Sequence, residues 1–157
     1  MSMIAAAVAV LFALVSFVPP VVLDERPLGN SVPTIERWKK AEKQMMRKIN
    51  RARTRRDRRA LKPSKAVGYQ ARKHSREMRS SGELFHSELG ETLGDLSWSV
   101  AGETVGRGGS MKDIFRAFMH SPPHKKVLMM GKFRRMGVGV VRTRDGVRYV
   151  TVMLLNY

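Results

Sequence analysis

Apolar residues recur at helical spacing in three stretches of this chain, separated by Pro, Gly and Ser. The first stretch predicts a helix that begins near residue 34, with one apolar face made of Trp38, Ala41, Met45, Ile49 and Ala52. Ser64 is the expected N-cap of a second helix, whose apolar face contains Val67, Ala71, His74 and Met78. Ser110 and Asp113 have capping-box spacing and open a third helix with the apolar stripe Met111, Ile114, Phe115, Phe118 and Met119.

The C-terminal part changes to a strand pattern. Residues 136–141 and 147–155 predict two strands, and Asp145-Gly146 between them is a strong hairpin signal. The last strand is apolar on both faces, which is typical of a central strand covered on both sides. Residues 96–101 alternate and predict a further short strand, whereas residues 104–110, with Gly106, Gly108 and Gly109, are expected to form a flexible connection.

These elements predict an α+β fold. We expect a three-layer α-β-α sandwich, with a small antiparallel sheet between helices, preceded by an N-terminal hydrophobic segment. The domain itself is assigned to residues 35–157, and the Pro- and Gly-containing residues 24–34 are assigned as a linker.

Residues 4–18 are apolar apart from one serine and resemble the hydrophobic region of a signal peptide. No basic residue precedes this run and no small-x-small cleavage pattern follows it, so a retained membrane anchor extending to Leu23 is the alternative. Residues 1–23 are therefore predicted to be a signal peptide or an anchor. Either assignment places the domain extracellularly or on a membrane, outside the cytoplasm.

The charge of the chain changes the range of partners to consider. Thirty Lys and Arg against 13 Asp and Glu give a net charge of +17 and an isoelectric point near 11.2. Such a surface attracts anionic polymers and anionic lipid surfaces. The densest cluster comprises Arg51, Arg53, Arg55, Arg56, Arg58 and Arg59. The chain has no motif that reads bases, so sequence-specific binding of nucleic acid is not expected. The absence of cysteine excludes disulfides and thiolate metal sites.

Two imidazoles and a carboxylate stand beside turns or element ends: His86, Glu103 and His124. If the fold brings them together, they form an open site for zinc or another divalent cation. Without metal, Glu103 could hold an imidazole in one tautomer as a general base. Ser87 and Ser121 are near in sequence but lack a nucleophile-elbow pattern. The alternative is a buried polar network that only stabilises the fold.

Two further histidines are expected to play no part in this site. His74 lies on the apolar face of the second helix, which is typical of a core histidine with a satisfied hydrogen bond. His120 falls outside the apolar stripe of the third helix, so it is expected to be exposed to solvent.

Five segments occur in the order found in a known family. They are Ile49-Asn50-Arg51-Ala52-Arg53, Phe85-His86-Ser87, Ala101-Gly102-Glu103-Thr104, Phe118-Met119-His120-Ser121-Pro122-Pro123-His124 and Gly137-Val138-Gly139-Val140. From about residue 45 the chain resembles the CAP superfamily, the SCP-like domain of cysteine-rich secretory, antigen 5 and pathogenesis-related proteins. The similarity is greatest to the compact microbial type without disulfides.

The resemblance implies an α-β-α sandwich with a cleft lined by two histidines and acidic residues, which in some members hold a divalent ion. His86 and His124 would be the imidazoles and Glu103 the acid. Three departures from the family pattern concern this region: Thr104 for Asn, Phe118 for Trp and Pro123 for Gly.

We therefore expect an exported or membrane-tethered binding module that takes a metal, a small hydrophobic ligand or an envelope component. Binding is favoured over catalysis. A metal-dependent hydrolase using the same cleft and a polyanion-binding protein acting through residues 51–59 are the alternatives.

Overall fold

The computed structural model describes residues 35–94 and 96–157, with side chains from residue 40 onward. The predicted segment 1–23, the linker 24–34 and the Trp38 side chain lie outside this part. The elements are, in order, α1 (Ile35–Thr54), β1 (Lys62–Pro63), α2 (Lys65–Ser81), α3 (Leu89–Thr92), β2 (Val100–Gly108), α4 (Met111–His120), α5 (Pro122–Met129), β3 (Arg135–Arg142) and β4 (Arg148–Asn156). No helix in the described ranges combines the length and apolar content needed to cross a membrane.

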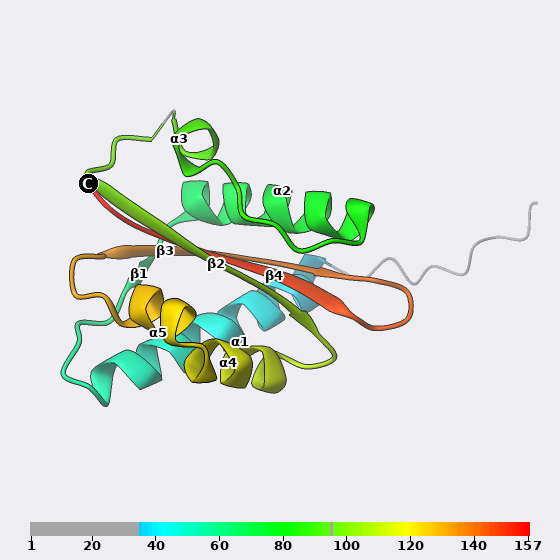
Figure 1. The fold of residues 1–157 in the computed structure, drawn as a ribbon, viewed down its shortest axis with the longest axis horizontal. Coiled ribbons are helices and arrows are strands. Elements are labelled where there is room, and N and C mark those ends of the chain that lie inside the picture. The colour runs from blue at the N-terminus through cyan, green and yellow to red at the C-terminus, as the bar shows by residue number, and fades with distance from the viewer. Residues whose placement is uncertain (1–34, 95) are drawn as a thin grey trace, which may run out of the picture. The chain divides into compact units, whose positions relative to one another are not determined.

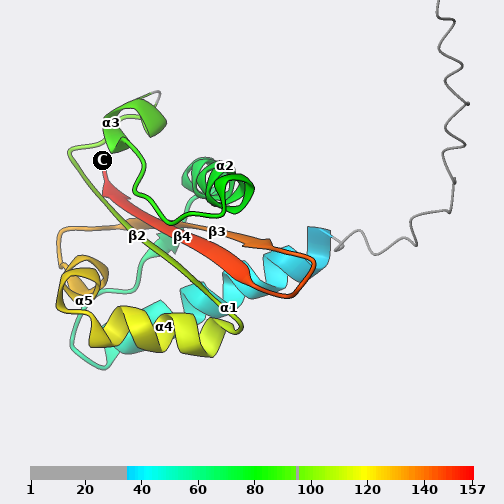
Figure 2. The ribbon, with the colours of Figure 1, turned by 45° about the vertical axis from the view of Figure 1, so that its right-hand side comes forward.

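One four-stranded sheet lies between two layers of helices (Figure 1). α2 and α3 cover one face, and α1, α4 and α5 cover the other, which Figure 2 shows from a second side. The strand order is β1-β3-β4-β2, so β4 is central, as its two apolar faces predict. The predicted α-β-α sandwich is confirmed. The sheet is mixed rather than purely antiparallel, because Lys62-Pro63 pairs parallel to β3.

The predicted helix boundaries follow from capping. Ser64 accepts a hydrogen bond from the backbone N–H of Val67 at the start of α2, and Gly82 ends that helix in the left-handed conformation with φ 76°. Ser110 accepts from the N–H of Asp113 at the start of α4. Pro122 and Pro123 do more than end α4: they occupy the first turn of α5, where a missing N–H costs nothing.

The two faces of β4 enter two separate hydrophobic clusters. Val150, Val152 and Leu154 pack with Met45 and Phe118 in the layer of α1 and α4. Met153 and Leu155, which alternate with them, pack with Val67 and Ala71 of α2. A strand buried on both faces thus joins the helical layers into one domain.

The expected connection at residues 104–110 is wrong, since β2 extends to Gly108 and begins at Val100 rather than at residue 96. The glycines that suggested a loop are needed for packing against α4. A Cβ at Gly106 would lie 2.8 Å from the Phe118 ring, and one at Gly108 would lie 3.0 Å from Ile114. Glycine in this strand therefore provides room for a helix rather than flexibility.

A second pair of glycines fixes α2 against β3. A Cβ at Gly137 or Gly139 would overlap backbone atoms of Val67 or Ala71. The close approach is reinforced by Ser75, whose hydroxyl contacts the Gly139 carbonyl at 3.1 Å and the Thr151 hydroxyl at 2.9 Å. These contacts set the position of α2, and with it that of His74.

Candidate functional site

The candidate site begins with Glu103, which points from edge strand β2 into the layer of α2. Its neighbours two residues away, Ala101 and Val105, pack beneath this layer, and side chains two apart share one face of a strand. Only 8% of Glu103 is exposed. A buried carboxylate is costly unless hydrogen bonds satisfy it, so its partners define what the site can do.

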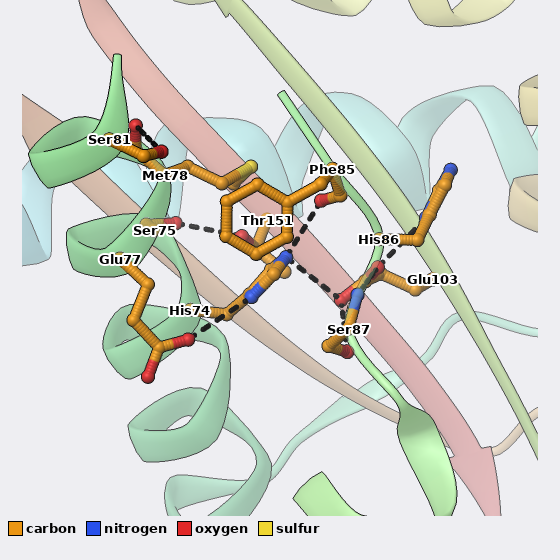
Figure 3. Close-up of polar contacts among 10 residues, drawn as sticks. All are labelled: His74, Ser75, Glu77, Met78, Ser81, Phe85, His86, Ser87, Glu103 and Thr151. Atoms are coloured by element: carbon orange, nitrogen blue, oxygen red, sulfur yellow. Dashed lines mark hydrogen bonds and ion pairs between the residues drawn. The ribbon is translucent and has the colours of Figure 1, made fainter. Parts of the chain in front are cut away.

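Both carboxylate oxygens of Glu103 have partners from the segment that follows α2 (Figure 3). Oε1 lies 2.8 Å from Nδ1 of His86 and accepts from the backbone N–H of Ser87 at 3.0 Å. Oε2 accepts from the Ser87 hydroxyl at 2.7 Å. We call Glu103, His74, His86 and Ser87 the Glu103 network. This network holds the segment that follows α2 against the sheet. The side chain of His86 remains 60% exposed.

His74 lies on the buried side of the same network. Its Nε2 donates to the Phe85 carbonyl at 2.9 Å and lies 3.9 Å from Oε2 of Glu103. The Phe85 ring meets the imidazole edge-on, with centroids 5.0 Å apart. The prediction of a satisfied core histidine is confirmed, but its proximity to Glu103 was not foreseen. The sequence did contain a signal for this proximity. His74 is a polar residue on the apolar face of α2, and the segment Phe85-His86-Ser87 follows it by little more than ten residues.

His124 lies in the opposite layer, on α5, so the edge strand β2 separates it from Glu103. Its Nδ1 is 2.8 Å from the Ser121 hydroxyl, and its ring is 5.4 Å from that of Phe118. Partial burial, and then the positive charge of His86, lower the pKa of His124 below its usual value. The charge of His86 therefore disfavours protonation of His124.

The structure brings His86 and Glu103 together but does not assemble the three predicted ligands. In the part of the chain with described side chains, no group of three or more His, Cys, Asp or Glu is placed to hold a metal ion. The oxygens of Glu103 are already engaged by Ser87 and His86. His120, as expected, is exposed, and its Nδ1 contacts the Arg116 carbonyl at 2.8 Å.

The serines near the site are not arranged as nucleophiles of a Ser-His-acid triad. Ser87 directs its hydroxyl to a carboxylate rather than to an imidazole. Ser121 does contact His124, but among the described residues no carboxylate contacts that imidazole to orient it. Leu84 and Phe85, which precede His86 in the chain, are 43% and 41% exposed, so this segment also presents apolar atoms to solvent. This composition suits ligand contact better than nucleophilic attack.

The arginine cluster at the end of α1 divides into two kinds. Arg51, Arg55, Arg56, Arg58 and Arg59 are exposed, as a polyanion-binding surface requires. Arg53 is fully buried, so its inclusion in that surface is wrong. The pattern contained a signal, since Arg53 follows Met45 and Ile49 at intervals of four and thus continues the buried face of the helix.

Comparison with known proteins gives one family and a set of similar folds. The profile described as the cysteine-rich secretory protein family, CAP, matches residues 46–156. A comparison with curated protein sequences gives no match.

Several solved structures share the fold. An outer surface protein from Borrelia burgdorferi has a TM-score of 0.69 at 16% identity, covering 75% of this chain and 93% of that one. An extracellular protein with an SCP domain from Bacillus anthracis has a TM-score of 0.71 at 21% identity, covering 77% of this chain and 42% of that one. A cysteine-rich secretory protein from Staphylococcus aureus has a TM-score of 0.67 at 20% identity, covering 78% and 40%. This chain therefore spans about two-fifths of the latter two proteins.

Proposed function

This chain belongs to the cysteine-rich secretory protein (CAP) family, and from that membership we propose that it acts outside the cytoplasm as a binding module rather than as an enzyme. Two proteins of similar fold are described as an outer surface protein and an extracellular protein, which supports this location. The apolar run at residues 4–18 supports it independently, as a signal peptide or a membrane anchor.

The observation that carries the proposal is that both oxygens of Glu103 have partners within the chain. A general base must have an oxygen or nitrogen available to the reacting proton. Both oxygens of Glu103 are instead used to hold His86 and Ser87 in place. Glu103 thus positions its neighbours rather than acting on a ligand itself, and what the network offers to a ligand is the exposed ring of His86, on a segment where Leu84 and Phe85 are also exposed. An imidazole on such a segment suits a small hydrophobic ligand with one polar group, or a divalent cation.

For a cation such as zinc, we propose the two imidazoles as ligands and Glu103 as the group that orients one of them. Glu103 contacts Nδ1 of His86, which leaves Nε2 of that exposed ring for the metal. A carboxylate behind a ligating histidine fixes the ring and its tautomer, and its loss typically weakens metal binding about tenfold or more. His124 would supply the second imidazole, and its lowered pKa favours the neutral, ligating form.

Zinc titration by calorimetry tests this proposal. We expect saturable binding to the wild-type domain, loss of that binding in the His86→Ala/His124→Ala variant, and about tenfold weaker binding in Glu103→Gln. His120→Ala is the matched control, because His120 is an exposed histidine outside the site. Unchanged zinc uptake by the double variant would exclude this site. Equal losses in the double variant and in His120→Ala would indicate nonspecific binding to surface imidazoles.

A further inference from the structure

Arg53, in the last turn of α1, is a fully buried guanidinium that uses only part of its hydrogen-bonding capacity. Its Nε donates to the Arg59 carbonyl at 2.9 Å. Its Nη1 donates to the carbonyls of Leu128 and Met130 at 2.7 and 3.0 Å. Its Nη2 is also buried and has no partner among the described residues. Arg53 therefore joins the end of α1 to the end of α5 and keeps one donor nitrogen unpaired.

No carboxylate of the residues with described side chains neutralises this buried charge. Among residues with described side chains, Arg53 forms no ion pair, and the only acid in the segment 51–62 is the exposed Asp57. Carbonyl groups at the end of α5 compensate in part, because a helix C-terminus has negative partial charge. A buried cation without a counter-charge still destabilises the fold, because the hydration that it loses on burial is not fully replaced.

Two further guanidinium groups, and no carboxylate of the described side chains, lie close to the carbonyl groups that Arg53 contacts. Arg134 donates from Nη1 to the Gly131 carbonyl at 2.6 Å. Arg58 lies over Gly131, where an added Cβ would be 3.6 Å from its Nη1. Gly131 directly follows Met130, whose carbonyl accepts from Arg53. Burial, then the charges of Arg134 and Arg58, lower the pKa of Arg53, which agrees with this convergence.

We propose that Arg58 and Arg134, above the buried Arg53, form a binding site for a phosphate group at the turn between α5 and β3. Three guanidinium groups repel one another in the absence of an anion, and a phosphate group offsets this repulsion while accepting N–H donors that the carbonyl groups leave free. Arg51, Arg55 and Arg59 lie exposed on the same segment and raise the local concentration of anions. The site involves none of the residues of the Glu103 network, so its test is independent of the proposed function.

The test compares two variants that lose equal charge. Arg58→Gln/Arg134→Gln removes the site and keeps polar side chains there. Arg79→Gln/Arg144→Gln removes two exposed arginines, from the end of α2 and from the hairpin, and serves as the control. Inorganic phosphate and pyrophosphate are titrated by calorimetry at constant ionic strength. Vesicles of phosphatidylcholine with and without phosphatidylglycerol are tested by flotation, and melting curves verify that each variant folds.

We expect saturable binding of pyrophosphate to the wild-type protein, weakened about tenfold or more in Arg58→Gln/Arg134→Gln and about twofold or less in the control. Vesicle binding that needs the same arginines and is displaced by pyrophosphate would support a lipid headgroup as the source of the phosphate. Saturable phosphate binding without vesicle binding would support a soluble phosphate compound. Equal weakening in both variants, or no saturable binding to the wild type, would overturn the proposal, because attraction by the net charge would then suffice.

Discussion

Glu103 and Arg53 are two buried charged side chains of opposite sign in opposite layers of this domain. Glu103, on the α2 side of the sheet, has partners from the chain for both oxygens, and two of them come from Ser87. Arg53, at the junction of α1 and α5, has three carbonyl partners, but among the described side chains it has no counter-charge and its Nη2 has no partner. The first group is satisfied within the described chain, and the second is not.

This difference separates two kinds of functional region. A saturated buried carboxylate stabilises the backbone around it and exposes a neighbour, here His86, to a ligand. A buried cation surrounded by other cations lacks a counter-charge that the described residues do not provide. A buried charge whose atoms all have partners in the chain therefore indicates a scaffold. A buried charge with an incomplete set of partners indicates a place for a ligand.

The largest effect is expected from removing Glu103. Glu103→Leu would leave the Ser87 N–H and hydroxyl without their acceptor and remove the carboxylate beside His74. We expect the free energy of unfolding to fall by about 3 kcal/mol. Denaturant unfolding followed by circular dichroism measures this quantity.

His86→Ala is the control for that prediction. Because the His86 side chain is 60% exposed, its contact with Glu103 should contribute about 1 kcal/mol or less to stability. If the two substitutions destabilised the domain equally, the exposed imidazole rather than the buried Ser87 contacts would hold the network together.

Arg53 should give a smaller loss. Arg53→Met keeps a long apolar side chain in the core, removes three hydrogen bonds to carbonyls and also removes an unpaired buried charge. Because these effects have opposite signs, we expect a loss of about 1 to 2 kcal/mol. The same unfolding experiment measures it. A loss equal to that of Glu103→Leu would contradict the view that the charge of Arg53 lacks compensation.

The fold could be predicted because the apolar periodicity was regular wherever a whole face is buried. α1, α2, α4, β3 and β4 all follow such patterns, and the hairpin at Asp145-Gly146 contains Gly146 at φ 97°. β2 was missed in part because Gly106 and Gly108 face α4, and a strand with glycine at most positions of one face gives a weak alternation. Packing space for Phe118 and Ile114 is a tertiary property that local sequence does not report.

The site was predictable only as far as single segments allow. The resemblance placed His86, Glu103 and His124 along one cleft, but the separation of His124 from Glu103 follows from the direction in which Glu103 points. That direction depends on the register of β2 against β4, where Glu103 lies opposite Met153. A shift of one residue would turn Glu103 to the face of α5. Sequence order places these residues in one region, and only the register decides which of them meet.

Thr104 provides the smallest and sharpest test of the comparison, because it is buried and unsatisfied like Arg53 but uncharged. Its side-chain oxygen has no partner among the described residues, and it stands where the family usually has Asn. Thr104→Val should leave the free energy of unfolding unchanged or raise it by up to about 1 kcal/mol, since a buried hydroxyl without a partner is replaced by a methyl group.

Thr151→Val is the matched control on the neighbouring strand. Thr151 is equally buried, but its hydroxyl is hydrogen-bonded to Ser75 at 2.9 Å, so we expect a loss of about 1 kcal/mol. Denaturant titrations of both variants measure the difference. If Thr104→Val destabilised the domain as much as Thr151→Val, the Thr104 hydroxyl would have a partner such as a bound water. An unpaired atom in this structure would then be weaker evidence for a missing ligand, at Arg53 as well as at Thr104.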